Sequence, residues 1–255
     1  MKANLKKWTE DYGLFVLVVV LLISVWQWIV VRGMIPAFIL PAPTSIWNSL
    51  VDNRQLLLEE HLPATLKEVL IGFGLSVIGG SVLGVGMHFS KRLEKVLYPF
   101  LVISQTIPLI AISPIFIMWF GYSIWSKIAV TILTAFFPIV VSTYDGLKNG
   151  GNEYRELLLT MGANRWDIFK KIQLPMALPA IFSGLKMSVV YCVVGATIGE
   201  WLGASVGLGY FSRRMSGNMQ ADAVFAAIFL LSLLGIVLFL IIGLLEKLLL
   251  KNKMR

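Results

Sequence analysis

The sequence predicts an all-α membrane protein whose chain crosses the bilayer six times. Of its 255 residues, 57% are hydrophobic and only 14% are charged, and the mean hydropathy is +0.80. A soluble chain of this length cannot bury that much apolar surface. The apolar residues gather in runs close to the roughly 20 residues that a helix needs to cross a membrane. The six runs are residues 14–31, 65–87, 97–120, 126–144, 176–199 and 223–245.

The first run, 14–31, follows three lysines (Lys2, Lys6 and Lys7), an arrangement that secretory signal peptides share. No small-residue cleavage site comes after it, and its length suits a membrane span. We therefore expect a retained first transmembrane helix. Together with an external segment it makes up residues 1–60, followed by a membrane core at 61–250 and a short cytoplasmic tail at 251–255.

The external segment, Ile39–Asn53, combines turn-forming prolines with a short amphipathic pattern. Thr44 or Ser45 can cap the start of a helix there. Its apolar stripe consists of Ile46, Trp47 and Leu50. We expect this helix to lie along the outer membrane interface.

The second run is rich in glycine, which lets membrane helices approach closely. Its glycines are Gly72, Gly74, Gly79, Gly80, Gly84 and Gly86. Close helix packing is the expected role, and a gating hinge is the alternative.

The third run is interrupted by Pro108 and Pro114 and carries polar side chains that include Gln105 and Ser113. Proline frees backbone carbonyls, and such irregular backbone is tolerated only beside protein or a water-filled cavity. We therefore place these four residues on a path through the membrane. The alternative is that the prolines merely kink a packed helix.

The longest charged segment is Asn152–Pro179, which must lie in water. The apolar positions of its first part recur at spacings of three and four, as in an amphipathic helix. They are Tyr154, Leu157, Leu158 and Met161. Gly162 can take the left-handed conformation that ends a helix.

A second short helix is expected after Gly162, because Asn164 can cap its start and Asp167 follows three residues later. Its apolar face consists of Trp166, Phe169 and Ile172. Pro175 lacks a backbone N–H and disfavours helical geometry at Leu174, so we expect the helix to break before the next membrane run.

The fifth run contains Lys186 and ends at Glu200 and Trp201. We expect Lys186 to be an interfacial anchor, with a buried partnership with an acid as the alternative. A carboxylate near the membrane is costly, so Glu200 is expected to face a polar cavity or a partner chain, with Trp201 offering a flat π surface beside it. The alternative is an interfacial tryptophan beside a solvated glutamate.

The charge distribution predicts how the chain is oriented. Lysine and arginine gather at the N-terminus, in the second and fourth connections and in the tail, so the positive-inside rule places both termini and the segment 152–175 in the cytoplasm. The net charge of +8 has no clustered face of the kind that binds nucleic acid.

The sequence lacks the motifs that several kinds of chemistry require. There is no Gly-x4-Gly-Lys-Ser/Thr loop, so ATP and Mg²⁺ have to be bound by a partner subunit. We expect no catalytic residues, no metal ligands and no cofactor in this chain. Cys192 is the only cysteine and lies in an apolar run, so we expect a structural thiol.

One motif resembles a known family. Glu156, Gly162, Ile172, Leu174 and Pro175 match the pattern Glu-Ala-Ala, three residues, Gly, nine residues, Ile-x-Leu-Pro, which resembles the signature loop of the membrane subunits of bacterial ATP-binding-cassette (ABC) importers. Two leucines replace the two alanines. A Leu-Pro-x-Pro segment at residues 40–43 and a Pro-x5-Pro-x4-Trp-Phe-Gly pattern at 108–121 are similar to the same family.

The resemblance implies a type I importer permease in a bacterial inner membrane. It implies that the coupling segment, with Ala163 in its turn, docks into a separate ATPase present in two copies. An external solute-binding protein and a second permease copy are further implied partners, and a paralogous permease is the alternative to a homodimer. A secondary transporter is the alternative from another class.

The substrate expectation rests on the string Gly199–Tyr210, which looks most like permeases for thiamine pyrimidine precursors. An aminopyrimidine can stack on Trp201 and donate hydrogen bonds to Glu200. Sulfonate, taurine and nitrate are the alternatives, and they would need positive charge on the path. Arg213 and Arg214 lie beyond it, where they can dock the binding protein.

Overall fold

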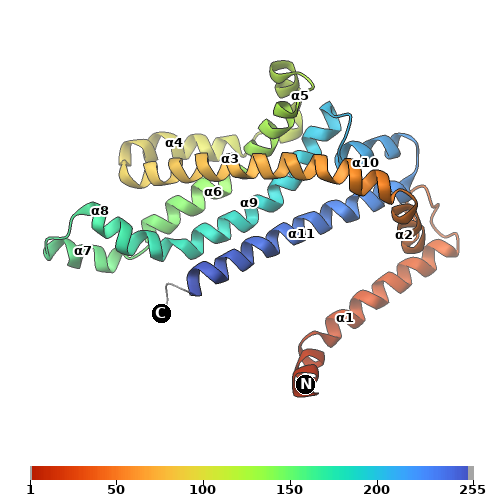
Figure 1. The fold of residues 1–255 in the computed structure, drawn as a ribbon, viewed down its shortest axis with the longest axis horizontal. Helices are drawn as coiled ribbons and strands as arrows, with labels where there is room; N and C mark the ends of the chain where they lie inside the picture. The colour runs from red at the N-terminus through yellow and green to blue at the C-terminus, as the bar shows by residue number, and fades with distance from the viewer. Residues whose placement is uncertain (1, 252–255) are drawn as a thin grey trace.

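The computed structural model describes the backbone of residues 2–251 and the side chains of residues 13–151 and 153–250. Every regular element in this part of the chain is a helix, which confirms the predicted all-α class (Figure 1). The elements are α1 (Lys2–Val31), α2 (Pro43–Asp52), the π-helix η1 (Leu56–His61), α3 (Leu62–Phe89), α4 (Lys91–Ser104), α5 (Leu109–Phe120), α6 (Ile124–Asn149), α7 (Asn152–Thr160), α8 (Arg165–Ile168), the π-helix η2 (Phe169–Gln173), α9 (Leu174–Gly203), α10 (Leu208–Gly217) and α11 (Ala221–Lys251).

Five helical stretches among the described residues are long and apolar enough to cross a membrane. They are Gly13–Val31, Leu56–Phe89, Ile124–Asn149, Arg165–Gly203 and Ala221–Leu250. A sixth crossing is reached when α4 and α5 count as one span, although the two helices are bent by 102°. The run 97–120 is therefore a sharp corner rather than a continuous helix. Pro108 explains the corner, because its backbone is extended (φ −63°, ψ 117°) directly before α5.

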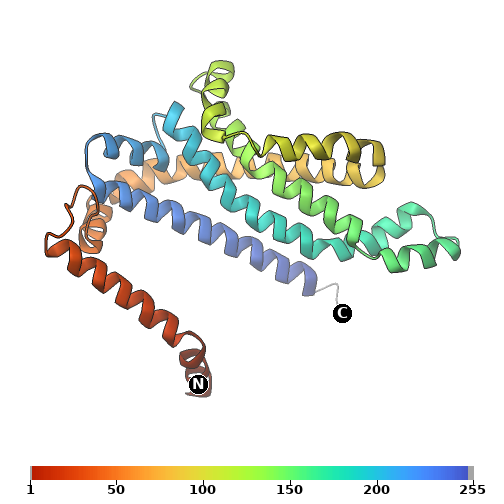
Figure 2. The ribbon, with the colours of Figure 1, turned by 180° about the vertical axis from the view of Figure 1, so that it is seen from behind.

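α6 and α9 lie against each other at the centre of the molecule, with α3 packed on α6 and α11 on α9 (Figures 1 and 2). Glycines permit the close approach of α3 to α6. A Cβ atom at Gly80 would lie 2.9 Å from Ile139 Cγ2, and one at Gly84 would lie 2.9 Å from the Val140 carbonyl oxygen. Close packing, as expected for this glycine-rich run, is confirmed at these positions.

Gly84→Ala is expected to destabilise the protein, whereas Gly74→Ala in the same helix is not. A Cβ at Gly74 meets nothing within 4 Å. That variant should therefore gain only the roughly 0.5–1 kcal/mol of stability that alanine adds over glycine inside a helix. Overpacking against the α6 backbone at Gly84 costs about 1–3 kcal/mol. The midpoint of thermal unfolding in detergent should fall for Gly84→Ala alone. Equal shifts in both variants would contradict this account of the α3–α6 contact.

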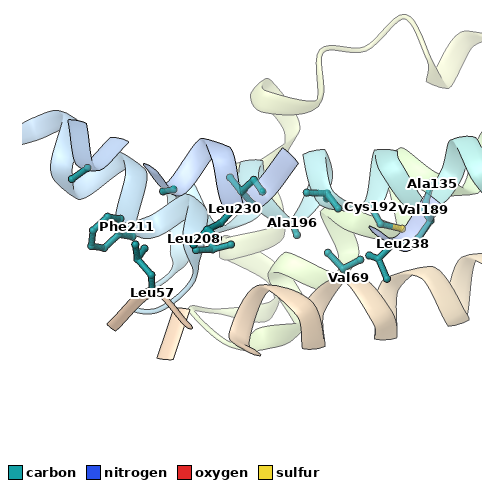
Figure 3. Close-up of a cluster of buried hydrophobic side chains, with 14 residues drawn as sticks. Leu57, Val69, Ala135, Val189, Cys192, Ala196, Leu208, Phe211, Leu230 and Leu238 are labelled. Carbon is teal, nitrogen blue, oxygen red and sulfur yellow. The ribbon is translucent and has the colours of Figure 1, made fainter. Parts of the chain in front are cut away.

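The largest buried apolar cluster joins η1, α3, α6, α9, α10 and α11 (Figure 3). Leu208 and Phe211 of α10 and Leu57 of η1 belong to it, and each is almost completely buried. Cys192 is also fully buried in this cluster, which confirms the structural role expected for the thiol. The cluster therefore fastens the short helix α10 to the long helices.

α1 diverges from the other helices in both views, and almost none of its span Gly13–Val31 is buried (Figures 1 and 2). Its end is tied to α2 by Gln27, whose amide donates to Thr44 Oγ1 (3.0 Å) and whose oxygen accepts from the Thr44 N–H (3.2 Å). The prediction that Thr44 or Ser45 caps α2 is wrong. α2 starts two to three residues earlier, with Ala42 at the cap position and Pro43 in the first turn, where proline needs no donor.

Lys186 also differs from its expected role as an anchor. Its Nζ lies 2.8 Å from Glu246 Oε2, and both side chains are about four-fifths buried. The pair joins α9 to α11, so the alternative of a partnered charge within the membrane is the one observed.

Candidate functional site

The charged segment after α6 folds as the expected pair of short helices, α7 and α8. The turn between them closes with two hydrogen bonds: the Ala163 N–H donates to the Leu158 oxygen (2.9 Å) and the Gly162 N–H to the Leu159 oxygen (3.1 Å). This is a Schellman motif, and it requires the positive φ of +83° that Gly162 adopts. Asn164 Oδ1 then accepts from the Asp167 N–H at 2.8 Å. The predicted end of the first helix and cap of the second are both confirmed.

The predicted break before Pro175 is wrong. The helix runs without interruption from Arg165 to Gly203 through the π-helical turn η2. In that turn the Leu174 N–H reaches back five residues to the Phe169 oxygen. Pro175 lies in the first turn of α9, directly after this wider turn.

The residues of the signature motif divide into two groups. Glu156 and Gly162 are exposed, whereas Ala163, Ile172, Leu174 and Pro175 are half-buried. Ile172 packs where α7 begins, since a Cβ at Gly151 would lie 2.7 Å from Ile172 Cγ2. Ile172 therefore helps to shape the segment, while the Glu156 side chain is exposed.

Aromatic and polar contacts anchor the segment to the end of α3. Phe169 stacks on Trp166 with ring centroids 5.3 Å apart and packs on Phe89 at 4.9 Å. The His88 ring nitrogen lies 3.1 Å from Gln173 Oε1, which is buried. These contacts hold the base of α8 against the bundle.

The free face of the segment is apolar. On one side of α7 it carries Tyr154 and Leu157, followed by Met161, which is the most exposed of them, at 73%. Leu159, on another side of α7, and Trp166 of α8 are exposed as well. An unpartnered apolar patch on a water-exposed segment is typical of a protein–protein contact.

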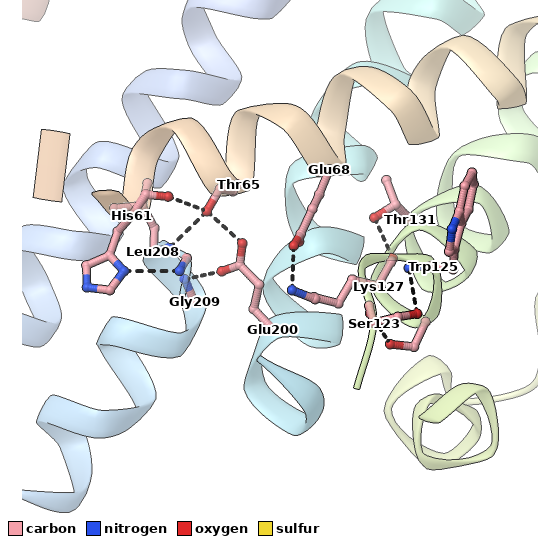
Figure 4. A network of polar contacts seen from close by, with 12 residues as sticks. His61, Thr65, Glu68, Ser123, Trp125, Lys127, Thr131, Glu200, Leu208 and Gly209 are labelled. Atoms are coloured by element: carbon pink, nitrogen blue, oxygen red, sulfur yellow. Dashed lines mark hydrogen bonds and ion pairs between the residues drawn. The ribbon is translucent and has the colours of Figure 1, made fainter. Parts of the chain in front are cut away.

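At the opposite end of the molecule, a polar network centres on Glu200 (Figure 4). The Glu200 carboxylate accepts from Thr65 Oγ1 and from the Gly209 N–H, each at 2.6 Å. Thr65 Oγ1 in turn accepts from the Leu208 N–H at 2.9 Å, and His61 Nδ1 accepts from the Gly207 N–H at 3.0 Å. We call these six residues the Glu200 network. It pins the turn between α9 and α10 to α3.

A buried ion pair lies next to this network. Lys127 Nζ is 2.8 Å from Glu68 Oε1, and the Glu68 side chain is almost completely buried. The pair connects α3 to the start of α6 (Figure 4).

The structure corrects the expected placement of Glu200. Its side chain is only 1% exposed, and its oxygens are occupied by internal donors rather than facing a cavity. Trp201 is 43% exposed and donates from Nε1 to Ser212 Oγ at 3.3 Å. Neighbouring residues therefore point to different places, the carboxylate into the protein and the indole outward.

The partners of Glu200 are residues that sequence reasoning missed, and the signal for them was the glycines that follow. Gly207 has φ +129°, and a side chain there would collide with the Glu200 carboxylate. In the sequence, two glycines shortly after an acidic residue therefore indicate that backbone packs directly against the carboxylate.

Two cavities lie along α9 on either side of Val194. One, of about 790 Å³, is lined by α6, α9 and the α4–α5 corner, and Gln105 and Tyr191 face it. The other, of about 580 Å³, is lined mainly by α9 and α11, with Trp201 at its wall. No lysine or arginine lines either cavity among the described residues.

Of the expected path residues, Gln105 and Trp201 line these cavities. Pro108, at the α4–α5 corner, and Pro114, inside α5, are exposed. Ser113 is 1% exposed, and its hydroxyl donates to the Ile110 oxygen at 3.0 Å. Like Glu200, Ser113 lines neither cavity, and its hydroxyl is hydrogen-bonded within the protein.

Comparisons with known proteins agree with the predicted family. The family of binding-protein-dependent transport system inner membrane components matches residues 72–251. The formylaminopyrimidine transport permease ThiX of Halalkalibacterium halodurans is 49% identical over 230 residues, covering 90% of this chain and 92% of that protein. A putative aliphatic sulfonates transport permease, SsuC of Bacillus subtilis, is 32% identical over 90% of this chain and 84% of that protein.

Among solved structures, a chain of the MetNI methionine ABC transporter in an inward-facing conformation has a TM-score of 0.61 and 18% identity, covering 75% of this chain and 97% of that chain. This likeness confirms the predicted type I importer permease fold. The chain belongs to the family of binding-protein-dependent transport system inner membrane components, and it is a transmembrane permease subunit of an ABC importer.

Proposed function

We propose that this permease carries an aminopyrimidine precursor of thiamine across the bacterial inner membrane. The observation that carries the proposal is the 49% identity to a formylaminopyrimidine permease along 90% of the chain. The uncharged lining of both cavities along α9 supports a neutral substrate over a sulfonate or nitrate, which would need cationic partners.

The burial of Glu200 changes how such a substrate would be held. Its carboxylate is already bonded within the protein, so recognition falls to residues that line the cavities. Gln105 offers an amide donor and acceptor in the larger cavity, and Tyr191 offers an aromatic face there. Trp201 offers a second aromatic surface in the other cavity.

Transport by the reconstituted importer tests the substrate class. The permease, its ATPase and its cognate binding protein would be placed in liposomes and supplied with labelled formylaminopyrimidine or an alkanesulfonate. ATP-dependent uptake of the pyrimidine supports the proposal. Uptake of the sulfonate, with no response to the pyrimidine, would favour the alternative that the 32% identical relative suggests.

Gln105→Leu is expected to lower pyrimidine uptake about tenfold, the cost of one lost polar contact to a bound substrate. Its unfolding midpoint should be unchanged, because Gln105 is exposed. Thr106→Val is the matched control, since Thr106 is exposed beside it and does not line the cavity. Equal uptake by both variants would remove Gln105 from the path.

We further propose that α7 and α8 dock into the ATPase and transmit its movements. Their exposed apolar face supports this, together with the exposed Glu156, whose carboxylate can accept hydrogen bonds from the partner. ATP and Mg²⁺ are bound by that partner, present in two copies, and a second copy of the permease completes the pathway. An external binding protein delivers the substrate at the α10 end.

This arrangement requires both termini and the α7–α8 segment to be cytoplasmic, with α10 outside. The α7–α8 segment and α10 lie at opposite ends of the molecule in both views (Figures 1 and 2). The excess of lysine and arginine on the α7–α8 side supports the direction.

Asn149→Cys is expected to react with a membrane-impermeant thiol reagent only from the cytoplasmic side, and Ser216→Cys only from outside. Both positions are exposed, and the native Cys192 is completely buried, so the unchanged protein provides a silent background. Labelling in right-side-out and inverted vesicles makes the measurement. The reverse pattern would overturn the orientation.

A further inference from the structure

Pro138 interrupts the backbone hydrogen bonds of α6 at the wall of the larger cavity. In an α-helix each N–H donates to the carbonyl four residues earlier, but Pro138, inside α6, has no N–H. The carbonyl of Thr134 therefore lacks its regular donor. Thr134 and Pro138 both line the cavity of about 790 Å³, and a helical carbonyl points along the axis from the first of these residues to the second. This carbonyl thus lies at the cavity wall.

The hydroxyl groups around Thr134 do not replace the missing donor. Its own hydroxyl donates to the Thr131 oxygen at 2.6 Å. The Ser188 hydroxyl, which reaches α6 from α9, donates to the next carbonyl, that of Ala135, at 2.8 Å. Among the described side chains, none donates a hydrogen bond to the Thr134 oxygen.

A second proline inside a helix shows how such a carbonyl can be satisfied internally. Pro114 removes the regular donor of the Ile110 carbonyl in α5, but the Ser113 hydroxyl donates to that oxygen at 3.0 Å. The residue before Pro138 is Phe137, whose side chain has no donor. An unpaired carbonyl inside a membrane protein is costly unless it finds a partner. For Thr134, that partner can come from the cavity.

Tyr191 of α9 lines the same cavity at the level of this carbonyl. A Cβ atom at Gly184 would lie 2.9 Å from the Pro138 oxygen, and one at Gly195 would collide with the Thr134 hydroxyl. These two glycines therefore mark where α9 contacts Pro138 and Thr134. Tyr191 lies between them in α9, and it is 42% exposed. An aromatic face and a free acceptor are thus present at one level of the cavity.

We propose that the Thr134 carbonyl accepts a hydrogen bond from the amino group of the transported pyrimidine while the pyrimidine ring stacks on Tyr191. The inference rests on the proposed substrate class. It assigns to a backbone group the acceptor role that the sequence suggested for Glu200. A pyrimidine amino group donates from the ring edge, which leaves the ring face free to stack. Nitrate and sulfonate have no such donor, so the carbonyl favours the aminopyrimidine over these anions.

Pro138→Ala tests the proposal, because alanine restores the N–H and so occupies the Thr134 carbonyl within the helix. The complete importer would be reconstituted in liposomes with labelled formylaminopyrimidine or with an analogue that carries a methyl group in place of the amino group. Both would be supplied at concentrations that saturate the binding protein. The wild type should take up the amino compound about tenfold faster than the analogue, and Pro138→Ala should lose most of that preference. Any preference of the binding protein itself is common to both importers and cancels in the comparison.

Pro99→Ala is the matched control. Pro99 also lies inside a helix, α4, but it is exposed and lines neither cavity along α9, so this variant should keep the preference. If Pro138→Ala fails to fold, Phe137→Ser is compared with Phe137→Ala. The serine hydroxyl would donate to the Thr134 oxygen as Ser113 does to its own helix, so only the serine variant should lose the preference.

The outcomes separate this inference from the proposed function. A Pro138→Ala importer that keeps the preference for the amino compound overturns the inference and leaves the substrate class intact. A wild type that takes up both compounds equally, or an equal loss of preference in Pro99→Ala, overturns it as well. A wild type that transports neither pyrimidine overturns the proposed function, and with it the inference that rests on it.

Discussion

Gly162→Val is expected to reduce substrate-stimulated ATP hydrolysis by the reconstituted importer at least about tenfold. Gly162 has φ +83°, and a Cβ at this position would meet no atom within 4 Å. The variant therefore causes no steric clash with its surroundings, and its cost lies in the backbone. A β-branched residue in the left-handed region costs roughly 1–3 kcal/mol. The turn between α7 and α8 would relax, and the two helices would lose the relative placement that docking requires.

Gly162→Asn is the matched control for this prediction. Asparagine adds a side chain of similar size but tolerates the left-handed conformation, so it should retain most of the stimulation. The measurement is ATP hydrolysis in proteoliposomes with and without the loaded binding protein. Full stimulation in the valine variant, or equal loss in both, would show that the backbone conformation of this turn does not govern coupling.

Glu200→Ala is expected to destabilise the permease by roughly 3 kcal/mol or more. The substitution leaves the N–H of Gly209 without its acceptor, and a buried unsatisfied group costs about 1–3 kcal/mol. The hydroxyl of Thr65 loses its bond to Glu200 and keeps only the longer one to the His61 oxygen (3.2 Å). It also leaves a cavity where the side chain was. The turn that holds α10 to α3 would loosen, and the yield of folded protein should fall together with uptake.

The thermal unfolding midpoint of purified Glu200 variants separates this structural role from substrate binding. Glu200→Gln keeps one acceptor oxygen and should lie between the wild type and Glu200→Ala in stability. A substrate ligand would behave differently, with unchanged stability and lost transport in both variants. A Glu200→Ala protein as stable as the wild type but unable to transport would restore Glu200 to the path.

Two neighbouring residues at the end of α9 have different roles in this importer. Glu200 holds the turn before α10 in place through Thr65 and the following glycines. Trp201 and, further along the helix, Tyr191 line the cavities. A residue pair that looks like one substrate site in the sequence thus serves two purposes.

The sequence by itself determined the features that depend on short-range patterns. Hydrophobic runs located the spans, because crossing a bilayer imposes a length and a composition that need no knowledge of neighbours. The turn at Gly162 and the cap at Asn164 were predictable for the same reason, since both are made by residues within a few positions of one another. The signature motif predicted the family to which the chain belongs, and the comparisons confirm it.

Tertiary structure alone decided which buried groups meet. Glu200 pairs with Thr65, 135 residues away, and Lys186 pairs with Glu246, 60 residues away. Periodicity shows which face of a helix is apolar, but it does not show what that face or an isolated charge will contact. The continuous helix through Pro175 belongs with these cases, because local geometry disfavours it and only a π-turn within a packed bundle accommodates it.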